Sequence, residues 1–198
     1  MRTAAVLVAV SLALAGCGKP GTDATTNTSA APAKPGKLPP VIEGGWATVF
    51  GDAKASLDLF ARLGLRPGPY EAKDGRFVST AVPTPLSDPS QKPAAVANFT
   101  ASGDAKTLDT VEFAFDSVGN DQTNAKSAFE TWVGQAMSRL GVAGADIVLP
   151  AIQKETPVSG DVEGAHVAVT KTEIEGGFRL VVTFTSPAAI AANNKTQG

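Results

Sequence analysis

The sequence predicts an α+β domain in two layers, in which two main helices pack on one face of an antiparallel sheet of about five to six strands. Two segments, near 52–63 and 123–140, carry apolar residues at helical spacing. Alternating segments separated by turn signals follow each of them. The order is helix, three or four strands, helix, an unassigned piece at 145–160, and two strands. Packing both helices on one face of the sheet buries their apolar sides.

The helix near 123–140 has the clearest pattern. Asn120, Asp121 or Thr123 supplies a capping side chain at its start. Gly141 followed by Val142 is typical of a Schellman ending, in which the glycine takes a left-handed conformation. The apolar residues at three- and four-residue steps are Ala125, Phe129, Trp132, Val133, Ala136, Met137 and Leu140.

The earlier helix is shorter and ends in the same way. Asp52 is placed to cap its start, and Gly64 followed by Leu65 ends it, with Pro67 beyond. The segments "RLGL" (62–65) and "RLGV" (139–142) are thus one helix ending written twice. The chemistry of helix termination explains this without an internal duplication.

Strands are predicted between the two helices. Asp74-Gly75 lies between "PYEAK" and "RFVSTAV" and predicts a hairpin with a type I′ turn. Further strands are predicted at 94–101 and 109–116. In the second of these, Val111, Phe113 and Phe115 share one face, which we expect to be buried.

The last two predicted strands, "AHVAVTKTEI" and "FRLVVTFT", flank Gly176-Gly177. A two-residue Gly-Gly turn and a three-residue Glu-Gly-Gly turn put opposite faces of the first strand inward. The sequence leaves both turns open.

The N-terminal 17 residues have the layout of an export signal. Arg2 precedes an apolar run that is too short to span a bilayer, which needs about 20 apolar residues. Leu14-Ala15-Gly16-Cys17 then resembles the lipobox of bacterial lipoprotein signal peptides. The resemblance implies a signal peptide over 1–16 and lipidation of Cys17 as the first mature residue. The alternative is an ordinary secretory signal that contains a cysteine.

The same stretch matches the dinucleotide fingerprint G-x-G-x-x-G over residues 16–21. The fingerprint requires a strand before the glycines and a helix after them, and the residues that follow, "TDATTNTSAAPAKPGK", have no helical pattern, so we interpret the match as a coincidence. Gly18 follows the cysteine, whereas Asp at that position is the inner-membrane retention signal of enterobacterial lipoproteins. We therefore expect the protein on the periplasmic face of the outer membrane rather than on the inner membrane.

Composition divides the rest of the chain. Residues 17–40 hold the lipidated cysteine and a linker rich in Pro, Ala and Thr, which has too little apolar surface to fold. A single α+β domain is expected over 41–186 and a flexible tail over 187–198. From residue 38 onward there are 13 Lys and Arg against 18 Asp and Glu, so the domain is mildly acidic. This balance, without a basic run, argues against nucleic acid as a partner.

Candidate catalytic groups are few. His166 is the only histidine, and we therefore expect no Ser–His–Asp, Cys–His or multi-histidine metal site. We expect His166 to lie at the surface or at a sheet edge, with a lone general base or pH sensor as the alternative. Motifs for a serine elbow and for a phosphate-binding loop are absent from the sequence. We expect no enzyme activity, no cofactor and no metal.

Two groups of oxygen-bearing side chains are candidates for a calcium site and for a catalytic carboxylate pair. The first group has oxygen donors that suit calcium, but it lacks the EF-hand spacing. We therefore expect its members to cap a helix or to form turns. The other is a carboxylate pair that we expect to be solvated at a hairpin tip, although a carboxylate-based hydrolase is an alternative. The two groups are Asp116, Asn120, Asp121 and Asn124, and Glu173 and Glu175.

The predicted lipid anchor, the linker and the lack of a recognisable set of catalytic residues together predict an envelope lipoprotein that binds or scaffolds another envelope protein. Trp46 is a candidate anchor for that partner, because Trp is enriched at binding hot spots, with burial in the core as the alternative. A lipid or other small ligand is the second prediction for function. It requires an apolar pocket lined by Trp132, Phe129 or Phe113.

Overall fold

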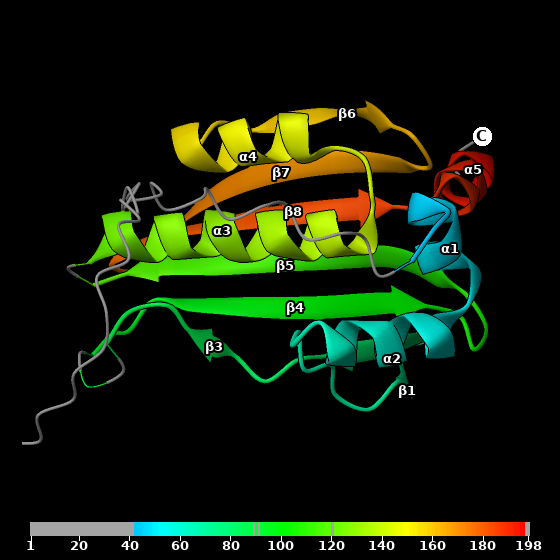
Figure 1. Ribbon diagram of the computed structural model, residues 1–198, viewed down its shortest axis with the longest axis horizontal. Coiled ribbons are helices and arrows are strands. Elements are labelled where there is room, and N and C mark those ends of the chain that lie inside the picture. Colours follow the sequence, from blue (N-terminus) through cyan, green and yellow to red (C-terminus); the bar gives the residue numbers. More distant parts are fainter. Residues whose placement is uncertain (1–41, 89, 91, 120, 197–198) are drawn as a thin grey trace, which may run out of the picture. The chain divides into compact units, whose positions relative to one another are not determined.

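The computed structural model describes residues 42–88, 90, 92–119 and 121–196. These residues form an antiparallel sheet in the order β1-β2-β4-β5-β8-β7-β6, with β3 paired to β4 (Figure 1). The strands are β1 (Glu71–Lys73), β2 (Arg76–Thr80), β3 (Thr84–Pro85), β4 (Val96–Gly103), β5 (Leu108–Val118), β6 (Val158–Val162), β7 (Ala165–Ile174) and β8 (Gly177–Thr185).

The helices of the described residues are α1 (Gly45–Gly51), α2 (Ala53–Arg62), α3 (Gln122–Leu140), α4 (Ala145–Lys154) and α5 (Pro187–Thr196). The predicted α+β class is confirmed. The predicted five to six strands and two helices are too few, since the described residues hold eight strands and five helices. The missed strands are short, with two residues in β3 and five in β6. Such pieces form through tertiary pairing rather than through their own pattern.

Both predicted Schellman endings are confirmed. Gly64 after α2 and Gly141 after α3 take φ of 81° and 62°, the left-handed region that favours glycine. The closing hydrogen bonds run from the N–H of Leu65 to the carbonyl of Phe60 (3.0 Å) and from the N–H of Val142 to the carbonyl of Met137 (3.2 Å).

Asp52 separates two helices where one was predicted. Its backbone is extended, with φ −144°, so α1 ends there and α2 begins. Its carboxylate accepts a hydrogen bond from the N–H of Ala55 at 2.9 Å, which confirms its predicted capping role.

Helix α4 fills the segment that the sequence left unassigned. Pro150 lies inside it, and a proline in a helix interior removes one hydrogen-bond donor, so the sequence pattern argues for a break. The helix forms because Val148, Ala151 and Ile152 are buried in the core. Glu155 ends α4 with φ 54°, a conformation that is rare outside glycine.

The turns of two hairpins show which residues pair between β1 and β2 and between β7 and β8. Asp74 and Gly75 take φ of 52° and 82° between the paired Lys73 and Arg76, which confirms the predicted turn. The β7–β8 turn is Glu175-Gly176, because Ile174 pairs with Gly177. Both turns proposed from the sequence are therefore wrong. Gly177 belongs to β8, where a side chain would lie 1.8 Å from the carbonyl oxygen of Ser117 on β5.

This register places the core on one face of the sheet. Val111, Phe113 and Phe115 of β5 are fully buried, as predicted. Helix α2 meets this face through Phe60, whose ring lies edge-on to Phe99 of β4. The other ring contacts between helices and this face are Trp46–Phe184 from α1 and Phe129–Phe115 and Trp132–Phe113 from α3.

The C-terminal segment 187–198, expected to be a flexible tail, instead forms helix α5 from Pro187 to Thr196. Ser186 begins it: its hydroxyl accepts a hydrogen bond from the N–H of Ala189 at 3.1 Å. The backbone N–H of Ser186 donates to the carbonyl of Asp109 on β5 at 2.8 Å. A capping serine followed by proline is a helix-start signal that the sequence reading missed.

The predicted signal peptide, Cys17 and the linker lie outside the described residues. Within the part of the chain that is described, no helix is both long enough and apolar enough to cross a bilayer.

Candidate functional site

The face of the sheet opposite the core carries no helix from the described residues (Figure 1). In Figure 1, α2, α3 and α4 all lie on the near side of the sheet. The ring contacts of α2 and α3 use the core face, and α4 buries Val148, Ala151 and Ile152. We call the opposite side the open face. Its side chains on β4, β5, β7 and β8 are Val96, Asn98, Thr100, Ser102, Thr110, Glu112, Ala114, Asp116, Val118, His166, Ala168, Thr170, Thr172, Ile174, Arg179, Val181, Thr183 and Thr185.

Small, β-branched and polar residues dominate the open face. Most of them are half-buried by their own neighbours on the sheet rather than by a second layer. Large aromatic residues are confined to the core face. On β5, the alternation of side chains between the two faces places Phe113 there. The open face is thus lined by small, β-branched and polar side chains and carries no phenylalanine, tyrosine or tryptophan on β4, β5, β7 or β8.

Glu112 lies at the centre of the open face. Its Cα partners on the neighbouring strands are Thr100 of β4 and Thr183 of β8. Burial among these neighbours raises the pKa of Glu112, and the positive charge of Arg179 lowers it to a smaller extent. Among the described residues, no hydrogen-bond donor or ion-pair partner contacts its carboxylate. A carboxylate that loses water without gaining a partner is unfavourable, and a positive charge from another molecule would relieve this.

Asp116 and Arg179 form a bidentate ion pair beside Glu112. Arg179 Nε and Nη2 lie 2.5 Å and 2.8 Å from the two carboxylate oxygens of Asp116. The pair holds the pKa of Arg179 above its ordinary value. Asp116 is therefore occupied, while Asp121 accepts a hydrogen bond from Asn124 (2.7 Å).

The calcium alternative finds no site in the described chain. Within those residues, no three His, Cys, Asp or Glu side chains gather closely enough to hold a metal ion. Asn120, the fourth residue considered for calcium, is not among the residues that the structure describes.

Three residues at the β6–β7 edge of the open face form a hydrogen-bonded chain. His166 Nδ1 lies 2.7 Å from Asp161 Oδ1, and His166 Nε2 lies 2.9 Å from Ser159 Oγ. The expectation that no Ser–His–Asp arrangement exists is therefore wrong. One histidine is sufficient for one such arrangement, so the histidine count did not exclude it.

The hairpin explains how this chain assembles. Ser159 and Asp161 are two residues apart on β6 and so share a face. The turn at Glu163-Gly164 pairs Asp161 directly with His166 of β7. The spacing Ser-x-Asp followed by a Gly-containing turn and His was the available signal, but the sequence reading assigned no strand to 158–162.

Glu155 joins two layers of the fold. Its carboxylate accepts hydrogen bonds from Lys126 of α3 (2.7 Å) and from Lys171 of β7 (3.0 Å). The bond from Lys126 is the main reason that the pKa of Glu155 lies below its ordinary value. Lys171 also lies 4.4 Å from the ring centroid of Phe178. This cluster clamps the end of α4 to the sheet.

Glu173 and Glu175, the carboxylate pair considered from the sequence, are both exposed. Glu173 is 80 % exposed and lies 3.7 Å from Lys171 Nζ. Glu175 lies in the β7–β8 turn, outside either strand. Both acids are solvated, as expected for a hairpin tip.

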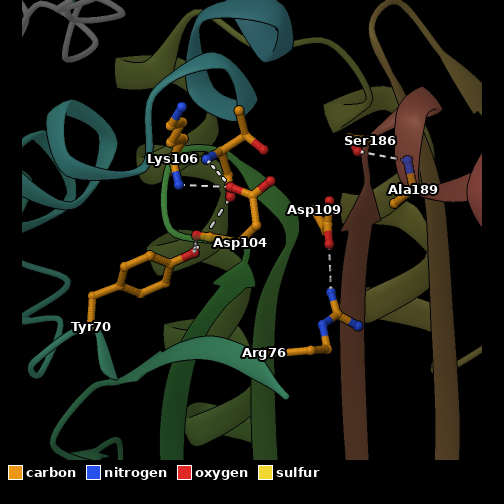
Figure 2. Close-up of polar contacts among 8 residues, drawn as sticks. Tyr70, Arg76, Asp104, Lys106, Asp109, Ser186 and Ala189 are labelled. Atoms are coloured by element: carbon orange, nitrogen blue, oxygen red, sulfur yellow. Dashed lines mark hydrogen bonds and ion pairs between the residues drawn. The ribbon is translucent and has the colours of Figure 1, made fainter. Parts of the chain in front are cut away.

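Figure 2 shows the polar contacts at the end of the sheet where α5 begins. Asp104 accepts from the N–H groups of Lys106 and Thr107, at 2.7 Å each, which closes the β4–β5 turn and lowers the pKa of Asp104. The Tyr70 hydroxyl donates to the carbonyl of Asp104 at 2.8 Å. Burial, followed by the charge of Asp104, raises the pKa of Tyr70 to about 12. These contacts hold a turn and point to no ligand.

The aromatic candidates lie mainly in the core. Trp46 is 1 % exposed, and its indole Nε1 donates to the carbonyl of Ala143 at 3.0 Å. It therefore offers no surface to a partner, and it takes the core position that was its alternative. Phe113 and Phe129 are fully buried, and both contact the ring of the half-buried Trp132, at 5.4 Å and 6.2 Å between centroids.

Comparison of the chain with protein-family models, with curated proteins and with solved structures finds no match. The open face, with Glu112 at its centre and the Ser–His–Asp chain at its edge, is therefore the candidate functional site on geometric grounds.

Proposed function

We propose that this protein is a lipid-anchored envelope protein whose domain binds another protein through the open face. The anchoring part rests on the lipobox-like segment ending at Cys17 and on the linker that follows it. Several acyl chains on one cysteine make attachment effectively permanent, since each buried CH₂ contributes about 0.8 kcal/mol. The proposed location is the periplasmic face of the outer membrane.

The docking part rests on one observation, a sheet face that no helix of the described residues covers, with the half-buried carboxylate of Glu112 at its centre. A sheet covered on one side exposes the other to water or to a partner. Interfaces have a centre low in charge and a polar rim. The open face has this polar rim, with Asp161 and the Asp116–Arg179 pair toward its edges, but it differs at the centre, where Glu112 lies among threonines as a single carboxylate.

The partner's chemistry follows from that carboxylate. A Lys or Arg side chain from the partner would lie between Thr100 and Thr183 and pair with Glu112 away from water. A buried pair of this kind contributes more to specificity than to affinity, because both charges lose their hydration. We therefore propose a protein partner with a basic side chain in an otherwise neutral contact surface.

The length of the proposed linker limits how far from its anchor the domain can reach to meet a partner. A flexible chain of about 20 residues has a root-mean-square reach of about 25 Å. A partner in the same membrane is thereby held at a high effective concentration, which compensates for a modest intrinsic affinity.

The test uses two matched substitutions, Thr183→Arg on the open face and Gln135→Arg on the exposed side of α3. Full-length tagged protein is cross-linked in cells and purified from membranes in detergent. Thr183→Arg is expected to lose the partner that wild type and Gln135→Arg retain. Equal retention by both variants contradicts open-face docking. A folded, anchored protein with no protein partner favours the small-ligand alternative instead.

A control variant tests the anchor separately. Cys17→Ser is expected to accumulate as unlipidated precursor, measured by intact mass. Mature acylated protein from Cys17→Ser contradicts the anchoring part and leaves the docking test unaffected.

A further inference from the structure

The hydrogen-bonded chain at the β6–β7 edge has the order of a nucleophile, a base and an orienting acid. Asp161 Oδ1 contacts His166 Nδ1 (2.7 Å), so a proton on Nδ1 leaves Nε2 free to accept one. Ser159 Oγ lies 2.9 Å from that Nε2. Both distances lie within the range over which a base abstracts a proton from a hydroxyl.

Regular strand pairing holds the three side chains in place. Asp161 is the direct Cα partner of His166, which pairs on its other side with Thr185 of β8. Ser159 lies two residues before Asp161 on β6 and so projects from the same face. The base is thus carried by an inner strand, and the nucleophile lies on an edge strand that other molecules reach. Groups carried on strands are positioned more precisely than groups carried on loops.

The pairing also supplies a backbone donor beside Ser159. The two residues that flank a two-residue turn form a hydrogen-bonded pair, and the pairs farther along the hairpin alternate between non-hydrogen-bonded and hydrogen-bonded. The closing pairs Val162–Ala165 and Ile174–Gly177 give the same alternation along β7. Ser159 therefore points its N–H toward the free edge of β6. A nucleophile's own N–H is one of the donors that stabilise an oxyanion in acyl transfer.

We propose that Ser159 is an acyl-accepting nucleophile toward carboxylic esters with small acyl groups, with His166 as its general base and Asp161 as a positioning residue. Ser159 Oγ forms a bond to the ester carbonyl carbon and gives its proton to His166 Nε2. The carbon–oxygen bond to the alcohol then breaks, and the alcohol leaves with the proton from Nε2. Water attacks the acyl-serine by the same route, releasing the acid and restoring Ser159. No oxidant, metal or cofactor enters the balance.

The site's exposure fixes the substrate class. Asp161 is 87 % exposed and His166 33 % exposed, so water competes for every contact. Such a site reacts with accessible esters that carry a good leaving group, and it gives a slow rate. Acetyl esters are the simplest members of this class, because a small ester reaches an exposed serine without a binding pocket.

The experiment exposes the full chain to a fluorophosphonate, which forms an oxygen–phosphorus bond to an activated serine as fluoride leaves. Peptide mass spectrometry locates the adduct and gives its rate of formation. Ser90 is the internal control, because its hydroxyl donates to Asp88 (2.7 Å) without a histidine. Ser159 is expected to react at least about tenfold faster than Ser90, a lower bound because a positioned base contributes about 10²–10⁴-fold. Equal rates at the two serines overturn the proposal.

Variants separate the roles of the three residues. Ser159→Ala is expected to remove the adduct, and His166→Gln to reduce the rate to that of Ser90. Asp161→Asn is expected to lower the maximal rate several-fold while the probe concentration that gives half-maximal rate stays unchanged, and Asp161→Glu to restore part of it. Unchanged labelling in His166→Gln overturns the proposal. Circular dichroism checks that each variant is folded.

Turnover is measured with p-nitrophenyl acetate. Wild type is expected to release p-nitrophenol faster than Ser159→Ala, and equal release contradicts the acyl-transfer step. This reactivity does not depend on docking, since the probe and the ester need no partner. The same measurement tests the expectation from the sequence that the chain is not an enzyme.

Discussion

The indole ring of Trp46 stacks on the ring of Phe184, with 4.2 Å between their centroids. This contact joins the first described helix to the last strand across the core. The indole Nε1 also donates to the carbonyl of Ala143, in the connection between α3 and α4. One side chain therefore holds together three parts of the chain that are distant in sequence.

Removal of this ring is expected to be costly. Trp46→Ala should lower the free energy of unfolding by about 3–5 kcal/mol, because it leaves a cavity and an unpaired carbonyl. Urea denaturation checks this, with Val82→Ala as the control, since Val82 is 57 % exposed. The control should change stability by less than about 0.5 kcal/mol. Equal effects of the two substitutions contradict the core position of Trp46.

Glu155 combines an unfavourable backbone with favourable ion pairs, and substitutions separate the two. Glu155→Ala loses both lysine contacts and keeps the left-handed conformation, which costs about 1–2 kcal/mol outside glycine. Glu155→Gly loses the same contacts but relieves the backbone. We therefore expect Glu155→Gly to be more stable than Glu155→Ala by about 1 kcal/mol in chemical denaturation. The reverse order would show that the backbone is not strained there.

The charge of Glu155 gives a pH dependence. Its pKa is lower in the folded protein than in the unfolded chain, so its ion pairs contribute fully above the unfolded value. That contribution is lost as the pH falls through the folded value. Glu155→Gln should therefore be less stable than wild type at neutral pH and match it in acid. A stability difference that persists unchanged in acid contradicts this.

Glu112 gives the opposite sign. Burial raises its pKa in the folded state, so folding opposes ionisation, and stability falls as the pH rises from the unfolded value through the folded one. Glu112→Gln should be more stable than wild type at neutral pH and similar to it below the unfolded pKa, which is about 4.3. Thermal denaturation at several pH values measures this. Lower stability of Glu112→Gln at pH 7 would mean that the carboxylate has a favourable partner.

Two aspartates at helix starts form a matched pair. Asp52 accepts a hydrogen bond from the N–H of Ala55, whereas Asp121, at the start of α3, makes no side-chain bond to the helix backbone. Asp52→Ala should lower stability by about 1 kcal/mol, the usual value of a capping bond. Asp121→Ala should cost clearly less. An equal loss in both variants would show that the capping bond of Asp52 is not its main contribution.

The sequence predicted the elements whose signals are local. The repeated Schellman endings, the Asp74-Gly75 turn and the buried face of β5 each depend on residues within a few positions of one another. These signals survive in the fold because the tertiary packing agrees with them.

The remaining elements depend on contacts that the sequence does not display. Helix α4 contains Pro150 and forms because its apolar side is buried, and strand β6 forms by pairing with β7. The Ser159–His166–Asp161 chain was missed for the same reason, since it exists only once that pairing is known. The predicted two-layer fold implies a sheet face without helices, but the residues that line this face depend on the strand register, which the sequence left open for the β7–β8 hairpin.

The central claim is that the open face binds a protein, and site-specific photo-cross-linking in cells tests it most directly. A photoreactive residue is placed at Thr183 on the open face and, in a separate variant, at Gln135 on α3. Open-face docking predicts one dominant cross-linked protein from position 183, none from position 135, and weakening of the product by Glu112→Lys. The same product from both positions, or none from position 183 in a folded and anchored protein, contradicts it.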